Sequence, residues 1–254
     1  MLALTLDLLK LASAGVSAFM GILVLLRNPR MRLNQIFFIL CMTVACWAFT
    51  IFEIRISADY EEAMTWLRIS FFWPLPSAIL LHFVLEFTGH QSFLERKWPY
   101  LMIYGPATVI AAYFFSSDFY SGLPVKETWG WTFKFPESLF SDAVNGYFAI
   151  MALIVVVLCH LFYLRQTDPL MKKQAGFALA GTSLYAISVA LSYGLFPALD
   201  INLPELSSIS FAVAVGGVVD EGPRARSGGA HGLGEGAAQG GVAGRGGGRG
   251  GRQG

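Results

Sequence analysis

Charged side chains are scarce in this sequence, and they are unevenly placed. They make up 14% of the 254 residues, while hydrophobic residues make up 55%. An ordinary soluble domain has roughly 25% charged residues. The charges stand in short groups between apolar runs of about 20 residues, which is the length that an α-helix needs to cross the hydrocarbon core. The scarcity argues against a soluble domain and predicts an all-α membrane protein, because backbone groups in lipid must be satisfied within the segment itself.

Several chemical motifs are also missing. The three cysteines, Cys41, Cys46 and Cys159, all lie inside apolar runs, which argues against a disulfide framework. The sequence has no His-Glu-x-x-His zinc motif and no glycine-rich phosphate loop. No lysine lies between Gln174 and Val219, which excludes a retinal Schiff base there. We therefore predict no catalytic residue, no metal site and no cofactor.

The apolar runs predict a bundle of seven transmembrane helices. The predicted spans are 5–26, 34–56, 63–88, 98–116, 142–164, 174–196 and 205–219. The loops after the first, third and fifth spans hold eight lysines and arginines, while those after the second, fourth and sixth hold mainly acidic residues. Positive loops face the cytoplasm, so we predict an extracellular N-terminus and a cytoplasmic C-terminus in the cell membrane. No basic region precedes the first span, so we expect it to stay uncleaved.

The last span is short, and the composition changes after it. Residues 205–219 supply too few apolar residues to cross a membrane comfortably. Residues 220–254 contain 15 of the 27 glycines and five arginines, but no aromatic residue, so they are predicted to be a disordered tail. The tail resembles an arginine–glycine RNA-binding segment, but a GC-rich gene read out of frame yields the same residues. We favour a frameshift and expect no nucleic-acid partner.

Two charged residues near the predicted outer ends of the second and third spans form a candidate pair. Glu53 and Arg68 lie at similar depth in adjacent helices joined by a short loop. A charge inside a bilayer is costly unless it is paired. They are either a structural ion pair that fixes the register of the two helices or a polar floor for an outward-facing ligand pocket.

The third predicted span carries further polar residues and two prolines. His82 and Glu86 are four residues apart, so they share one helical face. We expect His82 to hydrogen-bond to a neighbouring helix, whereas a proton relay or metal role is the alternative. Pro74 and Pro76 each remove a backbone donor, so they predict a kink that is either a fixed shape or a hinge.

The longest outer loop contains an alternating aromatic pattern. Trp129 and Trp131 would lie on the same face of an extended strand together with Phe133 and Phe135. One interpretation is an aromatic belt on the lipid headgroups. The other is a hairpin lid over an outer cavity of the bundle.

These features together resemble the seven-helix N-terminal sensor region of bacterial and archaeal histidine kinases. The matching positions are Asn34 at a helix start, Trp47 with Glu53, Trp66 with Arg68, Pro74 with Pro76, and the Phe-x-x-Glu-Phe-Thr-Gly pattern from Phe83 to Gly89. The resemblance covers about residues 5–219. It implies a membrane sensor whose helices feed a cytoplasmic PAS, kinase or cyclase region. The chain itself has neither a phosphoacceptor box nor an ATP lid, so we expect no enzyme activity of its own.

The sequence thus predicts a sensory input module of a two-component system that lacks its effector domain. Its expected partners are the lipid bilayer, a second copy of the chain or a separate kinase chain, and a small-molecule or membrane stimulus. The alternatives are a small-solute transporter or channel, and a scaffold without catalytic activity. A transporter would be expected to show matching Gly/Pro-interrupted helices in its two halves.

Overall fold

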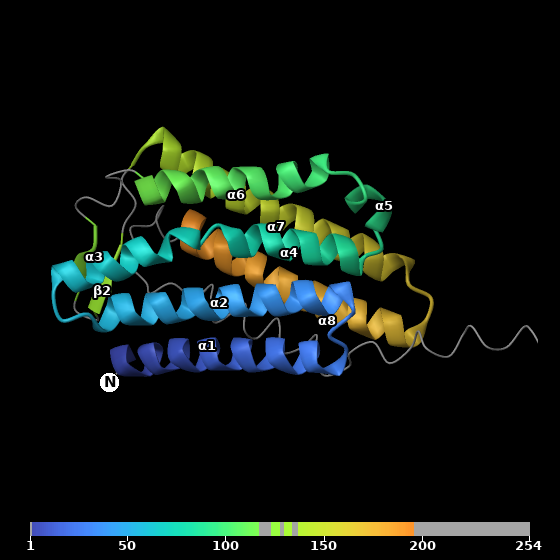
Figure 1. The fold of residues 1–254 in the computed structure, drawn as a ribbon, viewed down its shortest axis with the longest axis horizontal. Coiled ribbons are helices and arrows are strands. Elements are labelled where there is room, and N and C mark those ends of the chain that lie inside the picture. The colour runs from blue at the N-terminus through green and yellow to red at the C-terminus, as the bar shows by residue number, and fades with distance from the viewer. Residues whose placement is uncertain (1, 117–122, 128–129, 134–136, 196–254) are drawn as a thin grey trace, which may run out of the picture. The chain divides into compact units, whose positions relative to one another are not determined.

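The computed structural model describes residues 2–116, 123–127, 130–133 and 137–195, all within the unit Met1–Gly222. The predicted seventh span, the tail, Trp129 and Phe135 lie outside these residues. The described chain is a bundle of long helices with one small hairpin (Figure 1). The helices, 3₁₀ and π turns and strands are α1 Leu2–Arg27, α2 Arg32–Ile56, α3 Tyr60–Ile69, η1 Ser70–Phe72, α4 Leu75–Phe87, α5 Gln91–Leu94, α6 Trp98–Ser116, β1 Val125–Glu127, β2 Gly130–Thr132, α7 Leu139–Arg165, α8 Pro169–Ala190 and η3 Leu191–Leu195.

The helices alternate in direction, which gives the bundle two ends (Figure 1). At the end called here the Arg32 end, α1 leads into α2, α4 into α6 through α5, and α7 into α8. At the opposite end, called the hairpin end, α2 leads into α3 and α6 leads towards the hairpin and α7. Within the described residues, four helical segments are long and apolar enough to cross a membrane: Asp7–Arg27, Arg32–Ile56, Tyr60–Phe87 and Leu139–Arg165.

The central helix of the bundle is α4. It packs against α2, α6 and α7, and every residue from Pro76 to Glu86 is buried. A helix that is buried all round needs apolar side chains on every face, which explains why its polar residues stand out. The outer helices instead expose large apolar side chains, as expected of surfaces that face lipid; the most exposed are Leu139, Leu101, Phe115, Leu26 and Val109.

The third predicted span is interrupted in its interior. α3 ends at Ile69, a 3₁₀ turn follows, and α4 begins at Leu75. Pro74 has no N–H for the Ser70 carbonyl, which instead accepts a 3.0 Å bond from the Trp73 N–H. Pro76 lies in the first turn of α4, where no intrahelical donor is required. The two prolines therefore coincide with the end of α3 and the start of α4, with a 3₁₀ turn between the two helices.

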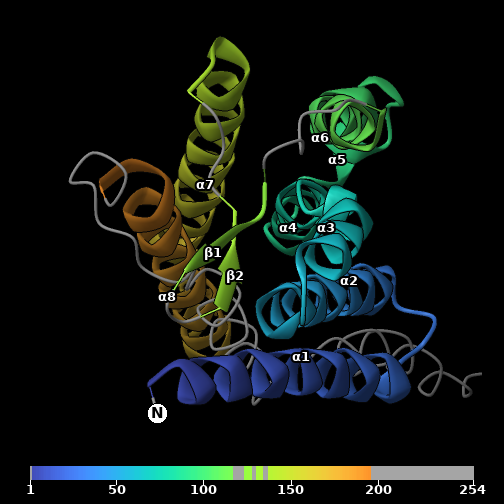
Figure 2. The ribbon, with the colours of Figure 1, turned by 90° about the vertical axis from the view of Figure 1, so that its left-hand side faces the viewer.

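The hairpin consists of β1 and β2, paired antiparallel with Lys126 opposite Trp131. Figure 2 looks from the hairpin end and shows the two strands between α7 and α8 on one side and α2, α3 and α4 on the other. Gly130 is in a left-handed conformation with φ +125°, and a Cβ there would lie 2.7 Å from the Arg55 carbonyl oxygen. Only glycine allows β2 to approach the end of α2 this closely.

Candidate functional site

Glu53 and Arg68 lie near the hairpin end, as their positions in α2 and α3 require. Glu53 is half-buried and Arg68 is exposed. In the part of the chain that the structure describes, no ion pair joins the two. The structure thus does not bring this candidate pair together, and a role for either residue in a ligand pocket stays a prediction.

Another ion pair occupies this end of the bundle. The Arg55 Nη1 lies 3.5 Å from the Asp7 Oδ1, which joins the end of α2 to the start of α1. The side chain of Arg55 is only 4% exposed, and Lys10, one turn after Asp7 on α1, is fully buried. None of these three residues is among the candidates predicted from the sequence. The signal that could have identified them is the presence of three charges at one end of two adjacent apolar helices.

The hairpin covers the end of α2 and the start of α3. Trp131 is buried, and its Nε1–H donates a 2.9 Å hydrogen bond to the Ser57 carbonyl. Its ring packs edge-on against Tyr60 and lies 5.2 Å from the Lys126 Nζ. Trp131 therefore packs on protein, and the choice between an aromatic belt and a lid stays a prediction. The alternation of Trp131 and Phe133 fits an extended strand, while Trp129 lies outside the described residues.

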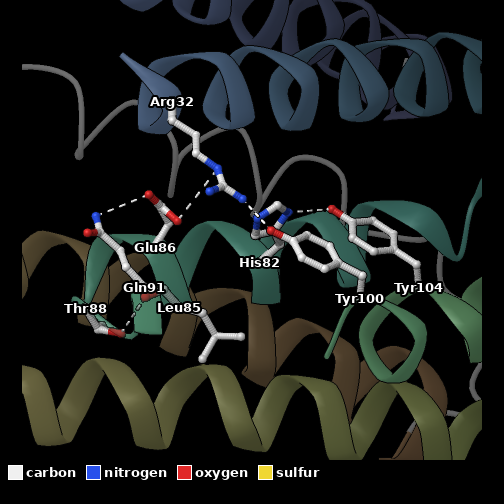
Figure 3. Close-up of polar contacts among 8 residues, drawn as sticks. All are labelled: Arg32, His82, Leu85, Glu86, Thr88, Gln91, Tyr100 and Tyr104. Carbon is white, nitrogen blue, oxygen red and sulfur yellow. Dashed lines mark hydrogen bonds and ion pairs between the residues drawn. The ribbon is translucent and has the colours of Figure 1, made fainter. Parts of the chain in front are cut away.

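The better-built polar cluster lies at the Arg32 end and is called here the His82 cluster; Figure 3 shows its members, which are His82, Glu86, Arg32, Gln91, Tyr100 and Tyr104. They come from α2, α4, α5 and α6. His82 and Glu86 are each 8% exposed. The i, i+4 spacing places the two side chains on the same face of α4, the face that meets α6 and the start of α2 (Figure 3).

Glu86 connects three elements. Its Oε2 lies 4.0 Å from the Arg32 Nε, and its Oε1 accepts a 3.2 Å bond from the Gln91 Nε2. Arg32 also donates a hydrogen bond to the Tyr100 hydroxyl on α6. The side chain of Arg32 is 54% exposed, so it links the buried carboxylate to the bundle surface. The sequence predicts that Glu86 shares a face with His82, but it does not predict the pairing of Glu86 with Arg32.

His82 makes a hydrogen bond to a neighbouring helix. Its Nδ1 lies 2.8 Å from the Tyr104 hydroxyl, and its ring packs edge-on against Tyr100 and Tyr104. Its Nε2 is buried and forms no hydrogen bond with any described residue. The same holds for the Glu86 Oε2, although that atom has the longer ion-pair contact with Arg32. One buried nitrogen and one buried oxygen with unfilled hydrogen-bonding capacity thus lie one helical turn apart.

A hydrogen bond between two hydroxyl groups joins α4 to α8 inside the bundle. The Ser77 Oγ on α4 lies 2.7 Å from the Tyr185 hydroxyl on α8, and both side chains are buried. Close to the α3–α4 interruption, the Trp73 ring stacks on the Phe148 ring of α7, with the two ring centroids 4.7 Å apart. The Ser77 bond joins α4 to α8, and Trp73, just before α4, packs on α7. A shift of α4 would therefore change its contacts with both helices.

No metal site is formed by the described residues, which contain no group of three or more His, Cys, Asp or Glu side chains close enough to hold an ion. His160 is exposed on α7, and the three cysteines are free thiols. The polar clusters are suited to hydrogen bonding and charge pairing between helices.

Comparison with known proteins decides the family. The family model described as the N-terminal 7TM region of histidine kinase matches residues 9–219. The chain belongs to this family. The match spans α1 to α8 together with the predicted seventh span, and confirms the resemblance drawn from the sequence. Neither the curated proteins nor the solved structures include a significant match to the chain.

Proposed function

We propose that the chain is the membrane-embedded sensory input module of a two-component signalling system. The observation that carries the proposal is the family match over residues 9–219, on a chain whose described residues include four helical segments suited to membrane crossing. In this proposal the N-terminus is extracellular, the Arg32 end is cytoplasmic, and the bundle has seven spans. The segment after residue 219 would then lie on the cytoplasmic side, where an effector region or a separate kinase chain would receive the signal.

The mechanism proposed for this module is a shift between two packings of the bundle. A stimulus at the hairpin end can shift this equilibrium only if it binds one packing more tightly than the other. The central helix α4 contacts α2, α6 and α7, so a movement of α4 would change several interfaces together. The α3–α4 interruption gives the third span a place where its two halves can move separately.

The test is a fusion of residues 1–215 to a kinase with an intact seventh helix, reconstituted in membranes and screened against candidate stimuli. The control is the same kinase on an unrelated membrane anchor. The proposal predicts a stimulus that changes autophosphorylation of the fusion but not of the control. Equal kinase activity in the two proteins under every condition would contradict it.

The alternative of a small-solute transporter rests on the interrupted third span. Transporters carry such interruptions at matching positions in two halves of the chain. Among the described helices, Pro106 lies within α6, which continues unbroken past it. The sensor is therefore the better-supported function, and solute uptake by vesicles containing the purified chain would reverse this choice.

A further inference from the structure

The His82 cluster has two features that charge pairing alone does not explain. The first is the buried Nε2 of His82, which forms no hydrogen bond with the described residues. The second is the arrangement of Arg32, whose guanidinium is shared between Glu86 and Tyr100 while half of its side chain remains exposed. A buried polar atom without a hydrogen-bond partner is energetically unfavourable. In native structures such an atom often has a functional role or holds a bound water or ion.

We propose that the His82 cluster is a proton-operated latch in which protonation of His82 transfers the Glu86 carboxylate from Arg32 to the His82 imidazolium. In the unprotonated state Arg32 binds Glu86 and Tyr100 and fixes the start of α2 to α4 and α6. In the protonated state the Nε2–H donates to the Glu86 Oε2, and Arg32 is released to solvent. Both buried atoms that lack a hydrogen bond are then satisfied by each other.

The geometry allows this exchange. Residues four apart on a helix have Cβ atoms about 5–6 Å apart, so the imidazole of His82 can reach the carboxylate of Glu86 by a change of side-chain torsion. The Nδ1 already has its partner in Tyr104. Figure 3 shows the imidazole with Arg32 on one side and the α6 residues Tyr100 and Tyr104 on the other. A proton on the ring would repel the adjacent guanidinium, which has an exposed position available.

The proton would come from solvent at the Arg32 end. The titratable or charged groups that the described residues place against His82 are Arg32 of α2, Glu86 of α4, and Tyr100 and Tyr104 of α6. From α5, Gln91 adds an uncharged amide on Glu86. Of these groups, histidine is the one whose ordinary titration falls between about pH 5 and about pH 8. Arg32 and Gln91 are exposed and connect the buried pair to the surface.

The test measures the distance between the α1–α2 turn, two residues before Arg32, and α5 in the purified full chain in lipid nanodiscs. Spin labels at Arg30→Cys and Ser92→Cys, two exposed positions, are introduced after the native cysteines are replaced by alanine. The expected result is a mean distance that lengthens by about 2 Å or more between about pH 8 and about pH 5. His82→Gln keeps a hydrogen-bonding side chain but cannot titrate, so it should abolish the shift. Glu86→Gln should hold the longer distance at both pH values.

Two matched controls are available. His90 bonds to the Thr88 hydroxyl at the same end of the bundle, and His160 is exposed on α7; His90→Gln and His160→Gln should keep the full shift. An unshifted distance in the parent protein, or a shift that survives His82→Gln, overturns the proposal. If His82→Gln does not fold, ¹⁵N spectra of the histidine rings in the parent protein decide instead, because a His82 ring that stays neutral down to about pH 5 also overturns it.

The latch deepens the proposed sensory role, since it would make the signalling state depend on pH at the Arg32 end. Its test reads the arrangement of the helices and does not involve a kinase. A pH-dependent distance in a chain whose kinase fusion is never regulated would retain the latch and reject the sensor. A regulated fusion without a pH-dependent distance would reject the latch and retain the sensor.

Discussion

At the scale of single residues, Asn34 has the clearest structural task. Its side-chain amide donates to the carbonyls of Val24 and Asn28, at 3.1 and 3.2 Å, and so fastens the α1–α2 turn. Asn34 is buried, and its removal leaves both carbonyls without this donor. We predict that Asn34→Ala lowers the free energy of unfolding by about 1–3 kcal/mol, measured by denaturant titration in detergent micelles.

The neighbouring residue provides the control for this prediction. The Gln35 side chain donates to the Pro29 carbonyl in the same turn at 2.9 Å, but at an exposed site where water can replace it. Gln35→Ala should therefore change the free energy of unfolding by less than about 0.5 kcal/mol. Equal losses in the two variants would show that the turn responds to any lost hydrogen bond and that burial of Asn34 is irrelevant.

The polar residues show which part of the site can be predicted from sequence. The shared face of His82 and Glu86 follows from their spacing, because the helical period fixes it. The partner of Glu86 does not follow, since Arg32 comes from another helix and its reach depends on how α2 packs on α4. Glu53 and Arg68 were matched by depth alone, and depth does not determine which way a side chain points around its helix axis.

At the scale of elements, the contact between α1 and α2 depends on Gly21. A Cβ at Gly21 would lie 2.7 Å from the Cβ of Cys41 on α2, whereas a Cβ at Gly15 would meet nothing within 4 Å. Small residues allow such close approach between membrane helices. We predict that Gly21→Ala separates the two helices and costs about 1–3 kcal/mol of unfolding free energy. The measurement is the same denaturant titration.

Gly15→Ala is the matched control on the same helix. It adds the same methyl group in open space and removes the low helix propensity of glycine, so it should leave the free energy of unfolding unchanged or raise it slightly. A loss at Gly15→Ala as large as at Gly21→Ala would mean that the two substitutions act through α1 itself and not through its packing on α2.

The hairpin depends on a second glycine. Gly130 has φ +125° and sits against the Arg55 carbonyl, so a methyl group there is opposed by both conformation and space. We predict that Gly130→Ala weakens the docking of β2 on α2 by about 1–3 kcal/mol. Hydrogen exchange of the β2 amides should then be faster by about tenfold or more.

The control for the hairpin is Gly146→Ala in α7, where a Cβ would meet nothing within 4 Å. Exchange of the β2 amides should be unchanged in that variant. If Gly130→Ala leaves β2 as protected as in the parent protein, the hairpin is held by its own pairing and by Trp131, and its approach to the Arg55 carbonyl contributes little.

Helix boundaries were predicted less well than helix positions, for a reason visible in the caps. The third span was expected from residue 63, but α3 begins at Tyr60, because the Asp59 carboxylate accepts from the Glu62 N–H at 2.9 Å and Glu62 bonds back to the Ala58 N–H at 2.8 Å. Similarly, the sixth span was expected from residue 174, but α8 begins at Pro169, because the Asp168 side chain caps its first turn. Hydropathy does not detect these polar first turns, whereas the capping pattern could have.

At the scale of the whole molecule, the sequence predicted the alternation of apolar helices because hydrophobic length is a direct physical requirement of a bilayer. The interruption of the third span by a 3₁₀ turn was harder to predict from the sequence. Two prolines predict a disturbed helix, but whether it bends or restarts depends on contacts such as Trp73 with Phe148, which connect segments far apart in the chain. Such contacts are set by packing and leave no periodic signal.

The orientation of the bundle is a prediction that labelling can test. The basic loops join helices at the Arg32 end, and positive loops remain in the cytoplasm. Pro29 lies in the α1–α2 turn and Lys126 in the hairpin, both exposed and at opposite ends. We predict that a membrane-impermeant maleimide labels Lys126→Cys in intact cells, but labels Pro29→Cys only after the cells are permeabilised.

The parent chain is the control for this experiment, since its cysteines lie within apolar helices and should stay unlabelled in both preparations. Labelling of Pro29→Cys alone in intact cells would reverse the orientation and place the His82 cluster on the outside. The latch would then respond to external acid, and its pH range would be met at the cell surface. Labelling of both positions from the same side would mean that α2, α3–α4 and α6 do not cross the membrane an odd number of times, which the bundle as described requires.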